Sequence, residues 1–380
     1  MRTLNFKWRL AITGTLIAAA LAGWQWPRGK QTGAKGKPFP ATPAKMTTAP
    51  PANPGPTNWD NQLHTAANDL SEASDATGRN RVLERLSQTL AAGDKSEISA
   101  AIRRFLDSKL DGPTGQGFKI GQKGYLAEAP TLRTFLLDQL GRIDPAAAAE
   151  YAKLILQSKD SPDEWALALR NLAAGDTSPE VRAWLAQKTG ELLAAKDWQQ
   201  NPSAGYLEAF DTVVYLGGVN FVPALAGMVC RQDNPALAHA AFLSLDRLVI
   251  NDPAALLATL LAQPGLLPGR DQTRADYFAR ADAGDSQQSD LLQNYLLNPR
   301  TSAAEREQFA GIFPNANFMV SPNLLTTSPA PDPGEIKKRD AAALKAVQQW
   351  LADPRFASVR PELEKIQARL QDYARQAGQP

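Results

Sequence analysis

The chain has 380 residues, of which 43% are apolar and 7% aromatic, with 41 Lys and Arg against 39 Asp and Glu. This length exceeds one compact core, and apolar content so low in aromatics favours a helical array over a sheet protein. Residues 1–57 hold eight basic residues and no acid, so the other 323 carry 33 basic and 39 acidic groups, a net charge of −6. An acidic body argues against nucleic acid as the main partner, because duplex binding depends on phosphate neutralisation.

The first 26 residues have the layout of an export signal. Arg2, Lys7 and Arg9 precede an uncharged apolar run over residues 10–26. A short basic segment before an apolar run is the usual arrangement for export, so the sequence predicts that the body lies outside the cytoplasm, in a bacterial cell envelope.

Two outcomes remain open for this segment. Cleavage after the small residue Ala22 would release a soluble periplasmic or secreted protein. Retention would leave an inner-membrane anchor, because Trp8 and the pair Trp24 and Trp26 are spaced like two interfacial aromatic belts. We expect the anchor, and with it contact with the membrane through residues 10–26.

Residues 27–57 form the next segment, with eight prolines, several lysines and no helical or strand periodicity. This composition predicts a basic, disordered linker that holds the body away from the bilayer. Two PxxP matches occur, at 40–43 and 51–54, but such matches arise easily in a proline-rich tether. We therefore expect this segment to be a plain spacer rather than a ligand for SH3-type domains.

From residue 58 onward the sequence reads as helices separated by polar, Gly and Pro punctuation. Residues 58–263 predict paired helices joined by short turns, which stack into an α-solenoid. Residues 264–333 predict an irregular segment with short helices, and residues 334–380 a C-terminal helical pair. Helix starts are expected where a capping side chain precedes a proline: Asp144-Pro145, Ser161-Pro162, Ser178-Pro179, Asn234-Pro235 and Asp252-Pro253.

Two of these segments resemble each other. Residues 176–193 read DTSPEVRAWLAQKTGELL and residues 233–249 read DNPALAHAAFLSLDRLV. Pro179 to Arg182 resembles the start of the second helix of a HEAT-type repeat, whereas the other copy has Ala238 in place of the arginine. The resemblance implies an all-α, HEAT-like α-solenoid and carries no active site. The shared helical face predicts these buried residues: Val181, Leu185, Leu237, Ala241, Leu245 and Leu248.

A glycine-rich stretch between Gly112 and Gly124 interrupts the helical pattern. Its glycine spacing differs from the dinucleotide-binding fingerprint, and a helix rather than a strand precedes it. One interpretation is an exposed loop or small hairpin between two helices. The other is a partner-binding loop that presents Phe118, Lys119 and Tyr125.

Residues suited to catalysis or metal binding are scarce. His64 and His239 are the only histidines and lie too far apart for a zinc site on one helix, and Cys230 is the only cysteine. Helical acids spaced like Glu208 and Asp211 are usually solvated surface charges. We therefore predict no catalytic residue, no metal site and no cofactor.

Three functions are compatible with this sequence. The preferred one is a non-enzymatic, membrane-tethered or exported helical-repeat scaffold that binds a protein partner. The second is an α/α-type envelope enzyme that acts on glycan through clustered carboxylates. The third is a structural component of a secretion or surface-assembly machine, for which a short membrane segment and a long linker are suitable.

Overall fold

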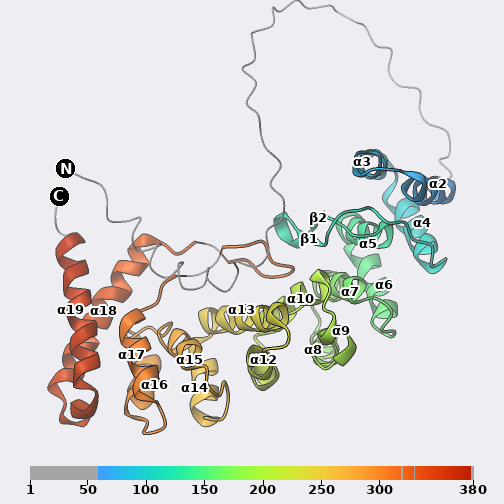
Figure 1. Cartoon of the computed structure of the whole chain (residues 1–380). Helices are drawn as coiled ribbons and strands as arrows, with labels where there is room; N and C mark the ends of the chain where they lie inside the picture. Colours follow the sequence, from blue (N-terminus) through green and yellow to red (C-terminus); the bar gives the residue numbers. More distant parts are fainter. Residues whose placement is uncertain (1–58, 318–319, 329, 378–380) are drawn as a thin grey trace, which may run out of the picture. The chain divides into compact units, whose positions relative to one another are not determined.

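The structure, a computed structural model, describes residues 59–317, 320–328 and 330–377. The predicted export segment and proline-rich linker lie outside these residues. Within the described ranges the protein is all-α, as predicted, apart from one short β-hairpin and a few 3-10 turns (Figure 1). None of the helices described there is both long and apolar enough to cross a membrane.

The first half of the described chain extends from α2 to α11, with the hairpin between α4 and α5. The hairpin pairs β1 with β2 in antiparallel orientation. The elements are α2 (Trp59–Glu72), α3 (Ala76–Ala92), α4 (Lys95–Asp107), β1 (Lys119–Ile120), β2 (Leu126–Glu128), α5 (Leu132–Ile143), α6 (Pro145–Ile155), α7 (Pro162–Gly175), α8 (Pro179–Leu193), α9 (Lys196–Gln200), α10 (Ala204–Glu208) and α11 (Asp211–Leu216).

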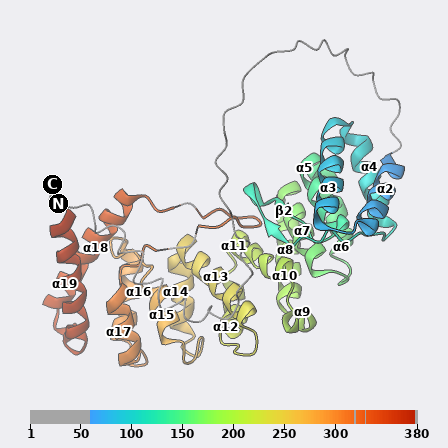
Figure 2. The ribbon, with the colours of Figure 1, turned by 45° about the horizontal axis from the view of Figure 1, so that its top comes forward.

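The second half contains the remaining helices and ends on two long ones. Non-helical chain between α17 and α18 extends back toward the hairpin in both views (Figures 1 and 2). We call its residues 320–328 the return turn; a β-bridge joins Pro322 to Thr327 within it. The elements are α12 (Val222–Val229), α13 (Pro235–Asn251), α14 (Pro253–Ala262), α15 (Asp271–Phe278), α16 (Ser286–Leu297), α17 (Ala303–Ile312), α18 (Pro333–Ala352) and α19 (Arg360–Ala377).

The proline-bearing caps predicted from the sequence all begin helices. The side chains of Asp144, Ser161, Ser178, Asn234 and Asp252 each accept a hydrogen bond from the backbone N–H three residues on, and a proline follows each cap. The missing proline N–H costs nothing at this position, while the cap satisfies a donor that the helix leaves unpaired. Local sequence thus determines where α6, α7, α8, α13 and α14 begin.

Some helices differ from the prediction. The sequence predicts one helix over 204–217, whereas the structure divides this stretch into α10 and α11. Phe210 N donates to Leu207 O and Thr212 N donates to Ala209 O, so a tightened turn with three-residue spacing joins the two helices. The structure also contains α9 and α15, which the sequence pattern does not predict.

One hydrophobic core extends through the described helices, and its members range from Trp59 to Leu370. Helices that are close in sequence pack together, such as α6 with α7, α12 with α13, and α18 with α19. Five of the six predicted core residues are at most 2% exposed, and Val181 is half-buried against the same core. Near the C-terminus the core is aromatic: Phe278 stacks on Tyr295 with ring centroids 3.9 Å apart.

Candidate functional site

A buried ion pair joins α5 to α7 and holds the hairpin. The side chains of Asp138 and Arg170 are 2% and 4% exposed, and Arg170 Nη1 donates to Asp138. The same Nη1 donates to the Gly124 carbonyl oxygen at 3.0 Å, and Leu126 N donates to Asp138 Oδ1 at 2.9 Å. Arg142 Nε donates to the other carboxylate oxygen at 2.8 Å. The pair therefore fastens the hairpin through backbone groups, with charge-assisted bonds.

A second buried acid, Asp211 at the start of α11, binds the return turn. Its carboxylate accepts hydrogen bonds from Leu325 N at 2.7 Å, Thr326 N at 2.8 Å and Thr326 Oγ1 at 2.5 Å. Arg247 Nη1 on α13 also donates to it at 2.9 Å. Asp211 is only 1% exposed, so the prediction of a solvated surface acid is wrong for this residue. Burial is tolerated because four donors compensate the charge.

A third pair joins Asp246 on α13 to Arg280, which lies just after the end of α15. Arg280 donates through Nε and Nη2 to the two oxygens of Asp246, both at 2.9 Å. Arg280 Nη1 donates to the Asn317 carbonyl oxygen, and Arg339 Nη2 of α18 donates to the Arg280 carbonyl oxygen. Each of the three pairs thus holds a non-helical segment against the helices. We call Asp138–Arg170, Asp211–Arg247 and Asp246–Arg280 the three anchoring pairs.

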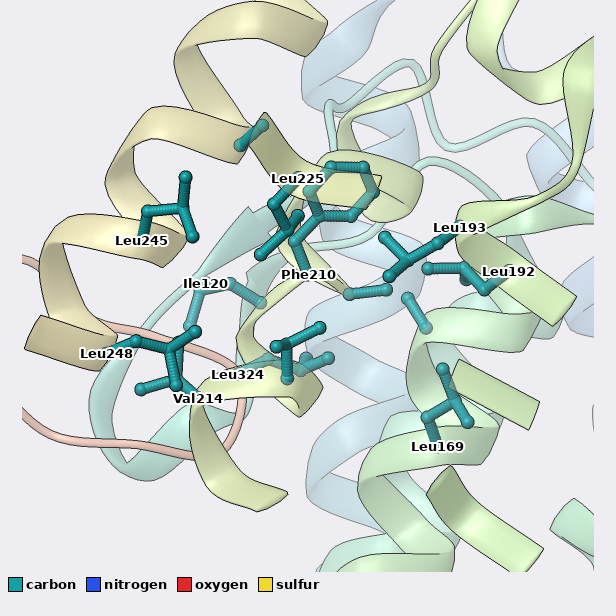
Figure 3. Close-up of a cluster of buried hydrophobic side chains, with 14 of the residues drawn as sticks. Ile120, Leu169, Leu192, Leu193, Phe210, Val214, Leu225, Leu245, Leu248 and Leu324 are labelled. Atoms are coloured by element: carbon teal, nitrogen blue, oxygen red, sulfur yellow. The ribbon is translucent and has the colours of Figure 1, made fainter. Parts of the chain in front are cut away.

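The hairpin and the return turn meet over α11 and α13. Leu324 is 1% exposed, and its side chain lies in the same apolar cluster as Ile120 of the hairpin, Val214 and Leu248 (Figure 3). Gly124 has φ +75°, and a Cβ there would lie 2.2 Å from the Leu324 carbonyl oxygen. Only glycine allows this approach, because both the backbone conformation and the contact exclude a side chain.

A cavity of about 310 Å³ lies between α13 and the return turn. Arg247, Asp246 and Asn251 line it from α13, together with hydroxyl side chains of the return turn such as Thr327 and apolar side chains such as Ile250. Two smaller cavities of about 220 and 130 Å³ lie beside the hairpin and beside α6. Pockets that enclose small molecules typically measure about 300–1,000 Å³, so only the first of these three reaches that range.

The structure alters the description of the predicted partner-binding loop. Phe118 is 8% exposed, so little of this ring is accessible to a partner, and the stretch contains the small hairpin that the first interpretation expects. The ring belongs to the main core, because removing apolar surface from water is favourable. Lys119 is exposed and forms an ion pair with Glu128 at 3.0 Å. A binding role for the exposed parts of this loop stays a prediction.

Tyr125, the third residue of that predicted loop, is half-buried between two arginines. The guanidinium carbons of Arg142 and Arg170 lie 4.4 and 5.0 Å from its ring centroid. A cation over the face of an aromatic ring is attracted by the ring quadrupole. Tyr125 therefore helps to hold the two arginines that bind Asp138.

Burial perturbs the acids around the anchoring pairs. Burial raises the pKa of Asp246, although Arg280 and Arg247 oppose the shift. Burial likewise raises the pKa of Glu208, with Arg247 opposing it and Asp211 adding to it. The pKa of Asp276 is raised to about 6, first by burial and then by Asp246, while Arg280 lowers it. In each case burial favours the neutral carboxyl group, while a nearby arginine favours the ionised form.

The histidines and the cysteine are not members of the three anchoring pairs. His64 is exposed, and its ring packs edge-on to Phe105. Burial lowers the pKa of His239, which favours the neutral imidazole. Cys230 is half-buried against the core. Across the described ranges, no cluster of three or more His, Cys, Asp or Glu side chains has a metal-binding arrangement.

The anchoring pairs were not predicted, yet the sequence contains a signal for two of them. An Asp-Pro helix start follows Asp138 after six residues, and another follows Asp246 at the same distance, 108 residues further along. The arginine partners follow these acids by 32 and 34 residues. Asp211 lacks the Asp-Pro mark. Its position in the core comes from the tertiary fold alone.

Comparison of the chain with protein-family models, curated proteins and solved structures gave no match.

Proposed function

We propose that this protein is a non-enzymatic scaffold, a HEAT-like α-solenoid that binds a protein partner in the bacterial cell envelope. The observation that carries the proposal is that one arrangement, a buried Asp–Arg pair that also binds a backbone carbonyl, occurs twice along the described chain. In Asp138–Arg170 and in Asp246–Arg280, an acid on one helix binds an arginine on a later helix or just beyond one, and each arginine also binds a backbone carbonyl of a non-helical segment. Repeated units that stack in sequence create the extended surfaces that repeat proteins use to bind partners.

The bonding of the buried acids favours a scaffold over a glycan-acting enzyme. Such enzymes need two carboxyl groups that face the substrate, separated by roughly 5–9.5 Å. Asp246 is the acid that lines the 310 Å³ cavity, and both of its oxygens bind Arg280. Three acids line the smallest of the three cavities: Glu164 is bound in the same way by Arg133, Asp107 accepts a hydrogen bond from Tyr151, and Asp160 pairs with Lys109. Release of soluble sugar from purified cell-wall glycan by the full chain would overturn the proposal in favour of the enzyme.

Photo-crosslinking in the native host tests partner binding directly. A crosslinking amino acid at Thr327, which is exposed at the mouth of the cavity, should capture a protein partner. The same amino acid at Asp290, an exposed position on α16, is the matched control. Equal capture at both positions, or none at Thr327, would contradict a specific partner surface there. Stable recovery with several membrane proteins after mild detergent extraction would instead support the structural-component alternative.

The envelope location has its own test. Residues 1–57 fused to a reporter that works only outside the cytoplasm should give activity, because the basic segment and apolar run engage the export machinery. Deleting residues 10–26 should abolish that activity. A mature protein that starts near residue 1 and resists alkaline carbonate extraction would support the inner-membrane anchor, whereas a start at Gly23 would establish cleavage. A reporter active only in the cytoplasm would overturn the location.

A further inference from the structure

We propose that the cavity between α13 and the return turn binds a carboxylate carried on an apolar group, and that Arg247 is the cation that binds it. The cavity measures about 310 Å³, enough for one or two small residues or a short-chain acid. The inference rests on the proposed function in one respect: the C-terminus of a protein partner is one source of such a carboxylate.

The bonding of Arg247 differs from that of several other arginines in the described chain. Arg104, Arg133 and Arg280 each bind a carboxylate through Nε and Nη2, the edge whose two N–H groups match two oxygens. Arg247 binds Asp211 through Nη1 only. Within the described residues, nothing accepts a hydrogen bond from its Nε or Nη2. The edge that elsewhere holds a carboxylate is therefore available on a residue that lines the cavity.

Asp211 does not need the whole of Arg247. Three other donors already bind its carboxylate, namely Leu325 N, Thr326 N and Thr326 Oγ1. The Arg247 side chain is 18% exposed, so its charge is mostly shielded from bulk water. A charge-assisted hydrogen bond is stronger in such a site than at an open surface.

The charges around the cavity disfavour a ligand with more than one negative charge. Asp246 is neutralised by Arg280, and Glu208 and Asp211 both face Arg247. The site therefore has no surplus of cations that would hold a doubly charged phosphate.

The remaining lining suits an apolar group beside the carboxylate. Val214, Leu243 and Ile250 contribute apolar surface, and Ile250 is 38% exposed. Asn251 and Thr327 add polar side chains. Burying the aliphatic part of a ligand against these side chains would add to the ionic contact.

Calorimetric titration of the full chain in mild detergent tests the inference with four probes. N-acetyl-Ala-Leu with a free carboxylate and 4-methylpentanoate should bind. The same peptide ending in an amide and inorganic phosphate should bind at least about tenfold more weakly, since they lose or mismatch the bidentate contact. Peptide binding clearly tighter than that of 4-methylpentanoate indicates a polypeptide C-terminus as the source, and equal binding indicates a small acid. An amide that binds as well as the acid, tighter binding of phosphate, or no binding at millimolar concentration would overturn the inference.

Variants separate the site from the fold. Arg247→Gln should weaken the acid probes about tenfold or more, whereas Arg103→Gln, at an exposed arginine of α4, should leave binding unchanged. Ile250→Trp fills the cavity without altering charge and should block binding even if Arg247→Gln fails to fold. Wild-type affinity in either folded cavity variant would overturn the inference. If the acid probes do not bind but crosslinking at Thr327 still captures a partner, the carboxylate inference is wrong and the scaffold proposal stands.

Discussion

Asp276→Asn should stabilise the protein at neutral pH. Burial raises the pKa of Asp276 to about 6, whereas an unfolded aspartate has a pKa of about 3.9. Between these values the folded state binds more protons than the unfolded state, so the contribution of Asp276 to stability falls as pH rises. A shift of about 2 units corresponds to about 3 kcal/mol, which the ionised side chain costs at pH 7.5. Asparagine keeps the size and removes the charge.

Urea unfolding of wild type and variant at two pH values measures this effect. The variant should gain up to about 3 kcal/mol at pH 7.5 and only about 1 kcal/mol at pH 4.5, where folded Asp276 is already protonated. Asp290→Asn removes an exposed charge on α16 and should stay within about 0.5 kcal/mol of wild type at pH 7.5. A destabilised Asp276→Asn at pH 7.5, or a gain that is the same at both pH values, would refute the reasoning.

Three further substitutions test the packing described above. Asp211→Asn should cost about 3 kcal/mol in urea unfolding, because it leaves the arginine on α13 without its buried partner; a neutral effect would contradict the anchoring role. Gly124→Ala should cost at least about 2 kcal/mol through its positive φ and the contact with the return turn, whereas Gly117→Ala, with open space around it, should change stability by less than about 0.5 kcal/mol. Leu245→Asp should leave the protein unfolded by circular dichroism, since Leu245 is 0% exposed and an unpaired buried charge costs several kcal/mol against a total of about 5–15. Leu154→Asp, at a residue 53% exposed, should fold normally.

The helix starts could be predicted because their causes are local. Ser161 and Ser178 each bind a backbone N–H three residues away, and the proline that follows each cap is adjacent in sequence. The same locality explains the missed α15, which has no capping side chain and no proline at its start. Its buried residues are Arg274, Ala275, Tyr277 and Phe278, and the arginine among them breaks the apolar pattern that would mark a core helix.

The candidate site could be predicted only in part, because its contacts are distant in sequence. Leu325 and Thr326 bind Asp211 across 114 and 115 residues. No spacing rule for helices or turns connects positions that far apart. Phe118 shows the opposite error: its glycine-rich surroundings suggest exposure, but the aromatic ring gains more from the core that the later helices provide.

The contact between Gly124 and Leu324 bears on how the protein unfolds. Helical repeats that touch only their sequence neighbours can fray from either end, one unit at a time. Here a glycine and a leucine 200 residues apart are in backbone contact. Closing so long a loop costs only about 1.5 kcal/mol more than closing one of 34 residues. Detachment of the return turn would uncover both the hairpin and Asp211. Local unfolding that begins in the later part of the chain would therefore also loosen the earlier part. Amide hydrogens in α5, α11 and α13 should then exchange through shared, cooperative openings rather than independent ones.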